Sequence, residues 1–190
     1  MSQFTIAILA LGANQPFEGM PPKETLIRAM NAFPAAGLAR PKMSQLYVTP
    51  CFPSGAGPDY VNAAALLQVE ENVTAKGLLS RLHEIEAMFG RQRLQRWGMR
   101  TLDIDLLAFG NAILPDQATH TEWRNLDPAS QINRTPDQLI LPHPRLQDRA
   151  FVLLPLAEIA PHWRHPLLNK SVMEMLAEIP ADDLAEIHPL

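Results

Sequence analysis

The stretch "RWGMRTLDIDLLAFG", residues 96–110, defines the last strand of the predicted fold and the place of its site. Its second half is an apolar run typical of a buried strand, interrupted by Asp103 and Asp105. Side chains two residues apart in a strand point to the same face of a sheet, so the two carboxylates are neighbours and Ile104 faces the opposite way. At a separation of about 6.5 Å they repel by about 2.5 kcal/mol, with an effective dielectric constant of about 20. We therefore expect a positive partner.

Arginines precede this strand directly. Between positions 91 and 100 the chain carries no acid and four arginines, which are Arg91, Arg93, Arg96 and Arg100. Guanidinium groups match phosphate oxygens in a bidentate manner, and Mg²⁺ is usually held by one or two carboxylates together with substrate phosphates. A lone pair of aspartates on a solvated sheet face would need no function. The arginines instead favour a nucleoside triphosphate site, which is not a P-loop because no G-x-x-x-x-G-K-[ST] occurs.

Working outward from this strand, hydrophobic periodicity predicts the other elements. They are strands at 4–11, 38–48, 60–69 and 102–109, and helices at 22–33 and 74–89. Pro22 suits the first turn of its helix, Thr74 is a good N-cap, and Gly90 supplies a C-terminal stop. The order strand, helix, strand, strand, helix, strand predicts an α+β ferredoxin-like sandwich, with helices packed on the faces of an antiparallel sheet.

The remaining sequence predicts the domain organisation. A length of 190 residues favours a single domain with a substantial core, covering 1–190. A polar stretch near 114–137 shows no clear period and is interpreted as an insertion. Short helices are predicted at 151–159 and 171–179, the second within a C-terminal helical tail near 171–190.

Composition excludes several classes of protein. A formal net charge of -4 argues against a general nucleic-acid binder. A single cysteine, Cys51, excludes an internal disulfide framework and fits a reducing compartment. No segment approaches the roughly 20 apolar residues that span a bilayer, and "FTIAILALG" favours a first strand over a signal peptide. We expect a cytoplasmic protein with neither a membrane nor a nucleic-acid partner.

The stretch "RWGMRTLDIDLL" resembles the signature of the 6-hydroxymethyl-7,8-dihydropterin pyrophosphokinase (2-amino-4-hydroxy-6-hydroxymethyldihydropteridine diphosphokinase) family of the folate pathway. The segments "ALGAN", "YVTP", "PDYVNAAALL", "LLSRLHEIEAMFGR" and "LILPHPRLQDRAFVLLPLAEIAP" resemble further family blocks in the family's order, and together the blocks span residues 6–161. The resemblance implies a transferase that moves the pyrophosphoryl group of ATP, its co-substrate, to the hydroxymethyl oxygen of the pterin and releases AMP. These two small molecules are the expected partners, and we expect a monomer.

By the same resemblance, Asp103 and Asp105 hold two Mg²⁺ ions that bridge the ATP phosphates. Catalysis also involves Arg100 and a loop that closes over ATP and carries Arg91 and Arg93. The ATP-binding residues implied are Glu86, Trp97, Arg100, Leu106, His143 and Arg149. The chemistry expected is phosphoryl transfer that depends on positioning and on neutralisation of charge.

The pterin is a flat, polar heteroaromatic ring, which requires aromatic faces for stacking and polar groups at its edge. The resemblance assigns stacking to Tyr60 and Phe151 and assigns the reading of the pterin edge to Asn62, whose amide both donates and accepts hydrogen bonds. Thr49 and Pro50, with its backbone, complete that edge. Trp97 covers the closed site.

Two alternatives stay open beside an active pterin pyrophosphokinase. Met99 stands where family members usually carry proline or a small residue, and this residue together with the insertion near 114–137 motivates a paralogue that acts on a modified pterin. The other alternative is a catalytically weak module that binds pterin or nucleotide. A decayed site would be expected to lose some of its predicted residues, so their joint presence favours an active enzyme.

Overall fold

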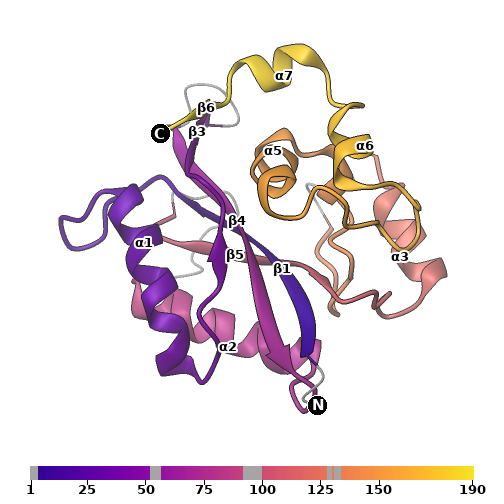
Figure 1. Ribbon diagram of the computed structural model, residues 1–190, viewed down its shortest axis with the longest axis horizontal. Coiled ribbons are helices and arrows are strands. Elements are labelled where there is room, and N and C mark those ends of the chain that lie inside the picture. Colours follow the sequence, from indigo (N-terminus) through magenta and orange to yellow (C-terminus); the bar gives the residue numbers. More distant parts are fainter. Residues whose placement is uncertain (1–3, 52–56, 92–99, 128–129, 131–133) are drawn as a thin grey trace.

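An antiparallel sheet runs through the middle of the molecule and carries helices on both faces (Figure 1). The computed structural model describes residues 4–51, 57–91, 100–127, 130 and 134–190. The strands are β1 (Phe4–Ala13), β2 (Lys42–Met43), β3 (Tyr47–Thr49), β4 (Tyr60–Glu70), β5 (Asp103–Phe109) and β6 (His188–Pro189). The helices are α1 (Pro22–Ala32), α2 (Ala75–Met88), α3 (Gln117–Arg124), α5 (Ala150–Ile159), α6 (Val172–Leu176) and α7 (Ala181–Ala185), with 3₁₀ turns η1 (Phe33–Ala36) and η2 (Leu146–Asp148).

The strand order confirms the predicted ferredoxin-like α+β class. The sheet runs β5-β1-β4-β3-β6, with β2 pairing the outer side of β4. Each of these pairings is antiparallel, and β4 lies between β1 and β3. The chain therefore follows the split β-α-β arrangement twice, once through α1 and once through α2.

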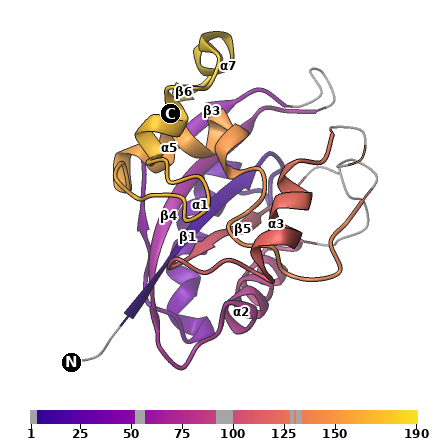
Figure 2. The ribbon, with the colours of Figure 1, turned by 90° about the vertical axis from the view of Figure 1, so that its right-hand side faces the viewer.

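Two apolar layers hold the helices against the sheet (Figures 1 and 2). On one face, Leu9 and Leu67 join the core formed with α1 and α2. On the other face, Ile8, Ala64 and Leu107 pack with α5 and α6. Because side chains alternate along a strand, both faces of β1 are covered by apolar groups, which is why this strand reads as a continuous hydrophobic run.

Local signals placed the first two helices correctly. Pro22 occupies the first turn of α1, and the hydroxyl of Thr74 accepts a hydrogen bond from the Gly77 N–H at 3.0 Å at the start of α2. Gly90 follows α2 with φ +73, a left-handed conformation that glycine adopts without steric cost. These predictions are confirmed. β1 extends two residues beyond its predicted end at Leu11.

The prediction of one continuous strand over 38–48 is wrong. Two short strands, β2 and β3, take its place, and their registers against β4 differ by one residue: Met43 pairs with Ala65 but Tyr47 pairs with Asn62. The extra residue forms a bulge in which Ser44 Oγ accepts from the Ala64 N–H at 3.0 Å. A side chain thus replaces a backbone acceptor, which periodicity alone does not reveal.

The polar stretch near 114–137 contains a helix, α3. Asp116 caps it by accepting a hydrogen bond from the Thr119 N–H at 2.9 Å. Leu114 forms a β-bridge with Leu141, so the start of this stretch is tied to the segment that follows it. The helix has one buried residue, His120, and therefore lacks the apolar stripe that would predict it.

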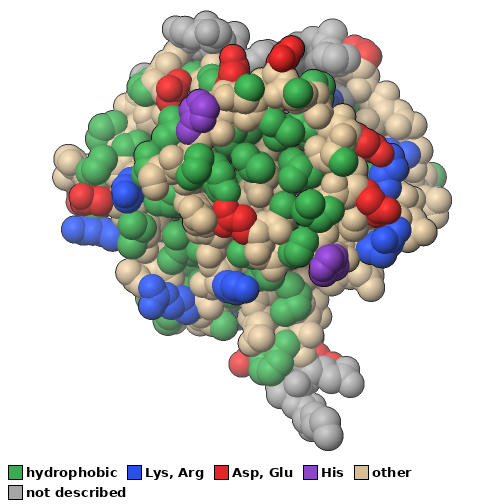
Figure 3. Space-filling model, turned by 45° about the horizontal axis from the view of Figure 1, so that its top comes forward, with side chains coloured by type: hydrophobic (Ala, Val, Ile, Leu, Met, Phe, Trp, Pro, Cys, Tyr) green, Lys and Arg blue, Asp and Glu red, His purple; other side chains and the backbone are tan. Residues whose placement is uncertain are grey.

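The C-terminal residues form two short helices and a strand. α6 begins with a capping box between Ser171 and Glu174 and ends at Leu176, three residues before the predicted end. β6 then pairs with β3 through Val48 and His188, so the end of the chain joins the sheet. Figure 3 brings this end of the molecule forward, and hydrophobic side chains gather near the middle of that view. Among the described residues, no helix is both long and apolar enough to cross a bilayer.

Candidate functional site

Register brings the predicted site residues together at one end of the sheet. Gly12 of β1 pairs with Asp103 of β5 on one side and with Asn62 of β4 on the other. Asn62 in turn pairs with Tyr47 of β3. Alternation along each strand places Asp103, Asp105 and Asn62 on the face that carries α5. The carboxylates and the predicted pterin-binding amide therefore share one surface.

Asp103 has the positive partners that its sequence context predicts. Its carboxylate is paired with Arg100, and its Oδ1 lies 2.5 Å from Nη1 of Arg91. The Asp103 side chain is 13% exposed, so these pairs are shielded from much of the solvent. Two guanidinium groups beside one carboxylate offset its repulsion from Asp105. Arg93 and Trp97 lie outside the described residues, and their predicted roles stay predictions.

Asp105 is more open, with its side chain 42% exposed, and its Oδ2 lies 3.8 Å from Nη1 of Arg149. Burial acts to raise the pKa of Asp105, but the positive charge of nearby arginines, Arg149 first among them, outweighs that effect and lowers it. Asp105 is consequently ionised at neutral pH. An ionised, half-exposed carboxylate among arginines is suited to hold a hard cation beside phosphate oxygens.

His143 is held in a loop against the end of β5. Its backbone N–H donates to the Leu107 carbonyl oxygen at 2.7 Å. Its ring nitrogen Nδ1 accepts from the backbone N–H of Arg145 at 3.1 Å. Burial, reinforced by Arg149, lowers the pKa of His143 to about 3, so the ring is neutral at physiological pH. Because Nδ1 accepts, the proton of the neutral ring lies on Nε2. His143 can therefore donate one hydrogen bond to an anionic oxygen.

Glu86 is buried on the inner side of α2, with its side chain 2% exposed. Its Oε1 accepts from the Ile104 N–H at 2.7 Å and is paired with Arg91. Glu86 therefore joins α2, β5 and the start of the arginine-rich segment 91–100. Leu106 packs in the core with α1 and α2, so its side chain faces away from the carboxylates, and any contact of Leu106 with ATP would involve its backbone. The predicted ATP contacts of both residues stay predictions.

The predicted pterin edge is built on two neighbouring strands. Asn62 Nδ2 donates to Thr49 Oγ1 at 2.6 Å, and both residues are buried. Pro50 follows and is exposed. Tyr60, at the start of β4, is half-buried; burial raises its pKa, and the nearby Arg100 opposes that shift. The amide is thus held in one orientation before a ligand arrives.

Phe151 belongs to the first turn of α5 and is 38% exposed. The guanidinium carbon of Arg149 lies 5.6 Å from the centre of its ring, within the range of a cation–π contact. The start of α5 therefore presents a basic group and an aromatic face together.

Two positions act in the site beyond those predicted. Asn14 is buried; its Oδ1 accepts from the Arg100 N–H at 2.9 Å, and its Nδ2 donates to the Pro58 carbonyl oxygen at 3.2 Å. Its own N–H donates to the Arg100 carbonyl oxygen at 3.0 Å. Asn14 thus fixes Arg100, the last residue of the arginine-rich segment 91–100. Gly12 leaves room for Asn62. Both lie in "ALGAN", a segment whose resemblance to the family was noted but which does not by itself indicate what Gly12 and Asn14 do in the site.

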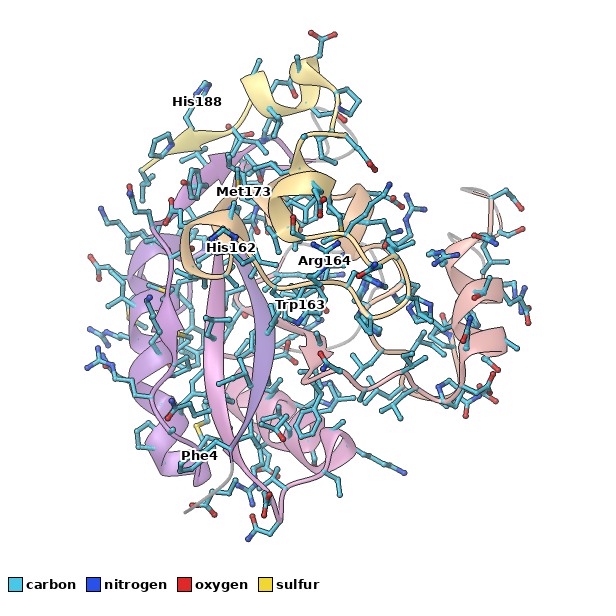
Figure 4. All side chains as sticks on the ribbon, turned by 45° about the vertical axis from the view of Figure 1, so that its right-hand side comes forward. Phe4, His162, Trp163, Arg164, Met173 and His188 are labelled. Atoms are coloured by element: carbon cyan, nitrogen blue, oxygen red, sulfur yellow. The ribbon has the colours of Figure 1, made fainter. Side chains whose placement is uncertain are left out.

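Two shallow hollows open at the opposite end of β1. One is lined in part by Phe4, Leu38 and Val73, and the other by Ile6, Arg40 and Lys42. Figure 4 shows Phe4 at the end of the molecule opposite to His188. None of the predicted site residues lines either hollow, so they are separate from the cluster around Asp103.

Comparison with known proteins agrees with this geometry. The model of the family 7,8-dihydro-6-hydroxymethylpterin-pyrophosphokinase (HPPK) matches residues 8–161. A 2-amino-4-hydroxy-6-hydroxymethyldihydropteridine pyrophosphokinase from Pseudomonas aeruginosa is 33% identical over 180 residues, which cover 94% of each chain. The enzyme of that name from Synechocystis is 38% identical over 122 residues, covering 64% of this chain and 51% of the relative.

Solved structures show the same fold. The wild-type HPPK-DHPS of Plasmodium falciparum with pteroate has a TM-score of 0.62 at 13% identity, and the match covers 94% of this chain and 45% of that one. The chain therefore spans about half the length of the Synechocystis relative and less than half of the Plasmodium protein. With the family model matched over most of its length, this chain belongs to the 7,8-dihydro-6-hydroxymethylpterin-pyrophosphokinase family.

Proposed function

We propose that the chain catalyses the ATP-dependent transfer of pyrophosphate to 6-hydroxymethyl-7,8-dihydropterin, with release of AMP, in folate biosynthesis. Membership of the family supports this activity. The observation that carries it is the gathering, on one sheet face, of a carboxylate pair with its arginines and of the Asn62–Thr49 pair. The first group suits phosphates and the second suits the polar edge of a heterocycle.

Asp103 and Asp105 are the proposed ligands of two Mg²⁺ ions. Among the described residues, no group of three or more His, Cys, Asp or Glu side chains could hold a metal by itself. Phosphate oxygens of ATP would complete the coordination, as is usual for Mg²⁺. The residues present fit this use, since both carboxylates share one face and Asp105 is ionised. The bound metal would neutralise charge that develops on the phosphates.

The proposed reaction requires an in-line displacement at the β-phosphorus. The hydroxymethyl oxygen of the pterin forms a bond to that phosphorus, the bond from it to the α,β-bridging oxygen breaks, AMP leaves, and the hydroxyl proton passes to solvent. Arg100, Arg149 and the neutral His143 are proposed to donate hydrogen bonds to phosphate oxygens. Their contribution is preorganised charge and orientation, and not covalent chemistry.

Pterin selection is proposed to rest on Asn62. Its donor and acceptor atoms can pair with the pterin edge together with Thr49 and the backbone at Pro50. Tyr60 and Phe151 are proposed to stack against the ring faces. Glu86, Leu106, Arg91 and Arg93 are proposed to contribute to the ATP side, with Trp97 covering the site. We further propose that the chain works as a cytoplasmic monomer without nucleic-acid or membrane partners, supported by its acidic net charge and single cysteine.

Product analysis tests this function. The purified chain is incubated with ATP, Mg²⁺ and 6-hydroxymethyl-7,8-dihydropterin, and the nucleotides are separated by chromatography. Pterin-dependent formation of AMP with an equal amount of pterin pyrophosphate is expected. ADP as the main product would contradict pyrophosphoryl transfer. Turnover only with a pterin of different substituent would favour the paralogue, and tight binding without turnover would favour the binding module.

A further inference from the structure

His120 links α3 to the loop that carries His143. It is fully buried, and its Nε2 lies 2.8 Å from the carbonyl oxygen of Pro142. Because a carbonyl oxygen only accepts hydrogen bonds, the His120 proton lies on Nε2 and its Nδ1 is an acceptor. That Nδ1 is buried and has no hydrogen-bond partner among the described residues.

His165 presents the complementary atom. It is fully buried in the segment between α5 and α6, next to Trp163, which Figure 4 labels. Its Nδ1 accepts from the N–H groups of Leu167 and Leu168 at 3.2 and 3.3 Å, so its proton lies on Nε2. That Nε2 is likewise buried and unpartnered within the described part of the chain. The two rings meet edge to face with centroids 5.9 Å apart.

The hydrogen bonds of His120 to Pro142 and of His165 to its following backbone N–H groups fix the tautomers of both rings. They leave His165 Nε2 as a donor and His120 Nδ1 as an acceptor in the same buried pair. Buried polar atoms are rarely left unsatisfied, so a hydrogen bond through one buried water fits this pair. A metal ion suits the site poorly, because the positive charge of Arg124 acts on both rings. Burial lowers the pKa of His120, and it lowers that of His165 to about 4, so both rings are neutral at physiological pH.

The next residue after Pro142 is the proposed phosphate donor His143, whose N–H is bonded to β5 through Leu107. The same loop is tied to the start of the polar insertion by reciprocal backbone bonds between Leu114 and Leu141 at 2.8 and 3.1 Å. The His120 side chain thus links α3 to the backbone of the loop that carries His143.

We propose that His120 is a positioning residue, braced by His165, which sets the place of His143 for the ATP phosphates. This inference rests on the proposed function and gives the insertion near 114–137 a role in it. The ring nitrogen of His120 holds the carbonyl group of Pro142, which is part of the peptide bond that precedes His143. Holding that peptide limits where the His143 side chain can lie. Loss of the bond leaves the Pro142 carbonyl free to move.

The test compares His120→Phe, which keeps a ring but removes the donor, with His120→Gln, whose side-chain N–H can reach the same carbonyl. His120→Phe is expected to reduce kcat/KM for ATP about 10-fold or more, because small misplacements of positioning groups have large effects on rate. The KM for the pterin should stay within about twofold, and His120→Gln should recover most of the loss. Glu122→Gln, an exposed position on the same helix, serves as the matched control.

A double-mutant cycle separates positioning from general structural damage. If His120 acts through His143, His120→Phe should cause no further loss of kcat/KM for ATP when it is added to His143→Ala. Independent, multiplicative losses, or equal losses for ATP and pterin, would overturn the proposal. So would an unchanged kcat/KM for ATP in His120→Phe while the wild type forms AMP. Absence of AMP formation by the wild type would instead contradict the proposed function.

Discussion

Gly12 faces Asn62 across the pairing of β1 with β4, and a Cβ atom at position 12 would lie 2.6 Å from the Asn62 side-chain oxygen. That separation is far below a normal contact, and the Tyr60 ring would lie 3.8 Å away. Any side chain at position 12 would therefore force the Asn62 amide to shift. The absent side chain of Gly12 lets the Asn62 amide lie over β1 while its nitrogen donates to Thr49.

Replacement of Gly12 by alanine should weaken pterin binding through Asn62. The added methyl group displaces the amide, and an unmatched polar group costs about 1–3 kcal/mol, which corresponds to a pterin Kd raised about 5- to 150-fold. ATP affinity should change little. Isothermal titration of each ligand measures both. In an Asn62→Ala background the same change should have no further effect on the pterin Kd; an additional loss there would show that Gly12 acts by another route.

The two carboxylates should separate stability from turnover. Asp105→Asn removes a half-exposed charge whose ion pair is 3.8 Å long, so stability should change by less than about 1 kcal/mol while turnover falls at least about 100-fold. Asp103→Asn should also abolish turnover, with a larger loss of stability because Arg91 and Arg100 each lose one ion pair. Steady-state rates and urea unfolding measure these effects. Asp148→Asn removes an exposed carboxylate paired with Arg145 and is the control; near-normal rates in Asp105→Asn would refute the metal assignment.

Glu86 should prove necessary for the fold. Glu86→Ala leaves the Ile104 N–H without its acceptor and removes one of the carboxylates that pair with Arg91, which should lower the free energy of unfolding by about 3 kcal/mol or more. Glu86→Gln keeps an acceptor for Ile104 and should lose about half as much. Urea unfolding monitored by circular dichroism compares the two variants. Equal stability of Glu86→Ala and the wild type, with ATP affinity alone reduced, would assign Glu86 to the nucleotide and not to the scaffold.

The sequence predicted those parts of the fold in which local and tertiary signals agree. β1 is apolar on both faces, β5 is an apolar run interrupted by two aspartates, α1 has proline at its start, and α2 has a threonine cap, so each was identifiable from its own residues. The break between β2 and β3 depends on a hydrogen bond from Ala64 to Ser44, which lies 20 residues earlier in the chain. Helix α3 was missed because a single buried histidine leaves no apolar period.

The candidate site shows the same division. Alternation places Asp103 and Asp105 on one face, which is a property of one strand. That Gly12 lies between Asp103 and Asn62 depends on the register of three strands and is invisible in the sequence. The clamp of Asn14 on Arg100 likewise joins residues 86 positions apart. The resemblance to family blocks includes Gly12 and Asn14, but their neighbours, and so their effects on Asn62 and Arg100, follow only from the three-dimensional structure.

Stability should fall as the solution becomes mildly acidic because of His165. Burial lowers its pKa in the folded chain to about 4, whereas the unfolded chain has the ordinary value of 6.5. Protons therefore bind preferentially to the unfolded chain between these values. The stabilisation is fully present above about pH 6.5 and is lost as the pH falls toward 4. His120, whose pKa is also lowered, acts in the same direction.

From pH 7 to pH 5 the free energy of unfolding should decrease by about 1–2 kcal/mol from His165 alone, given about 1.4 kcal/mol for each unit of pKa difference. The lowered pKa values of Asp105, Asp116 and Glu174 affect stability only at more acidic pH. His143, whose pKa is lowered to about 3, adds a loss of the same sign in this window, so the variant at position 165 isolates the share that comes from His165. Urea unfolding at both pH values measures the change. His165→Phe should reduce the pH dependence, whereas His162→Gln, at an exposed position, should retain it. An unchanged pH dependence in His165→Phe would show that the buried histidine pair does not control stability in this range.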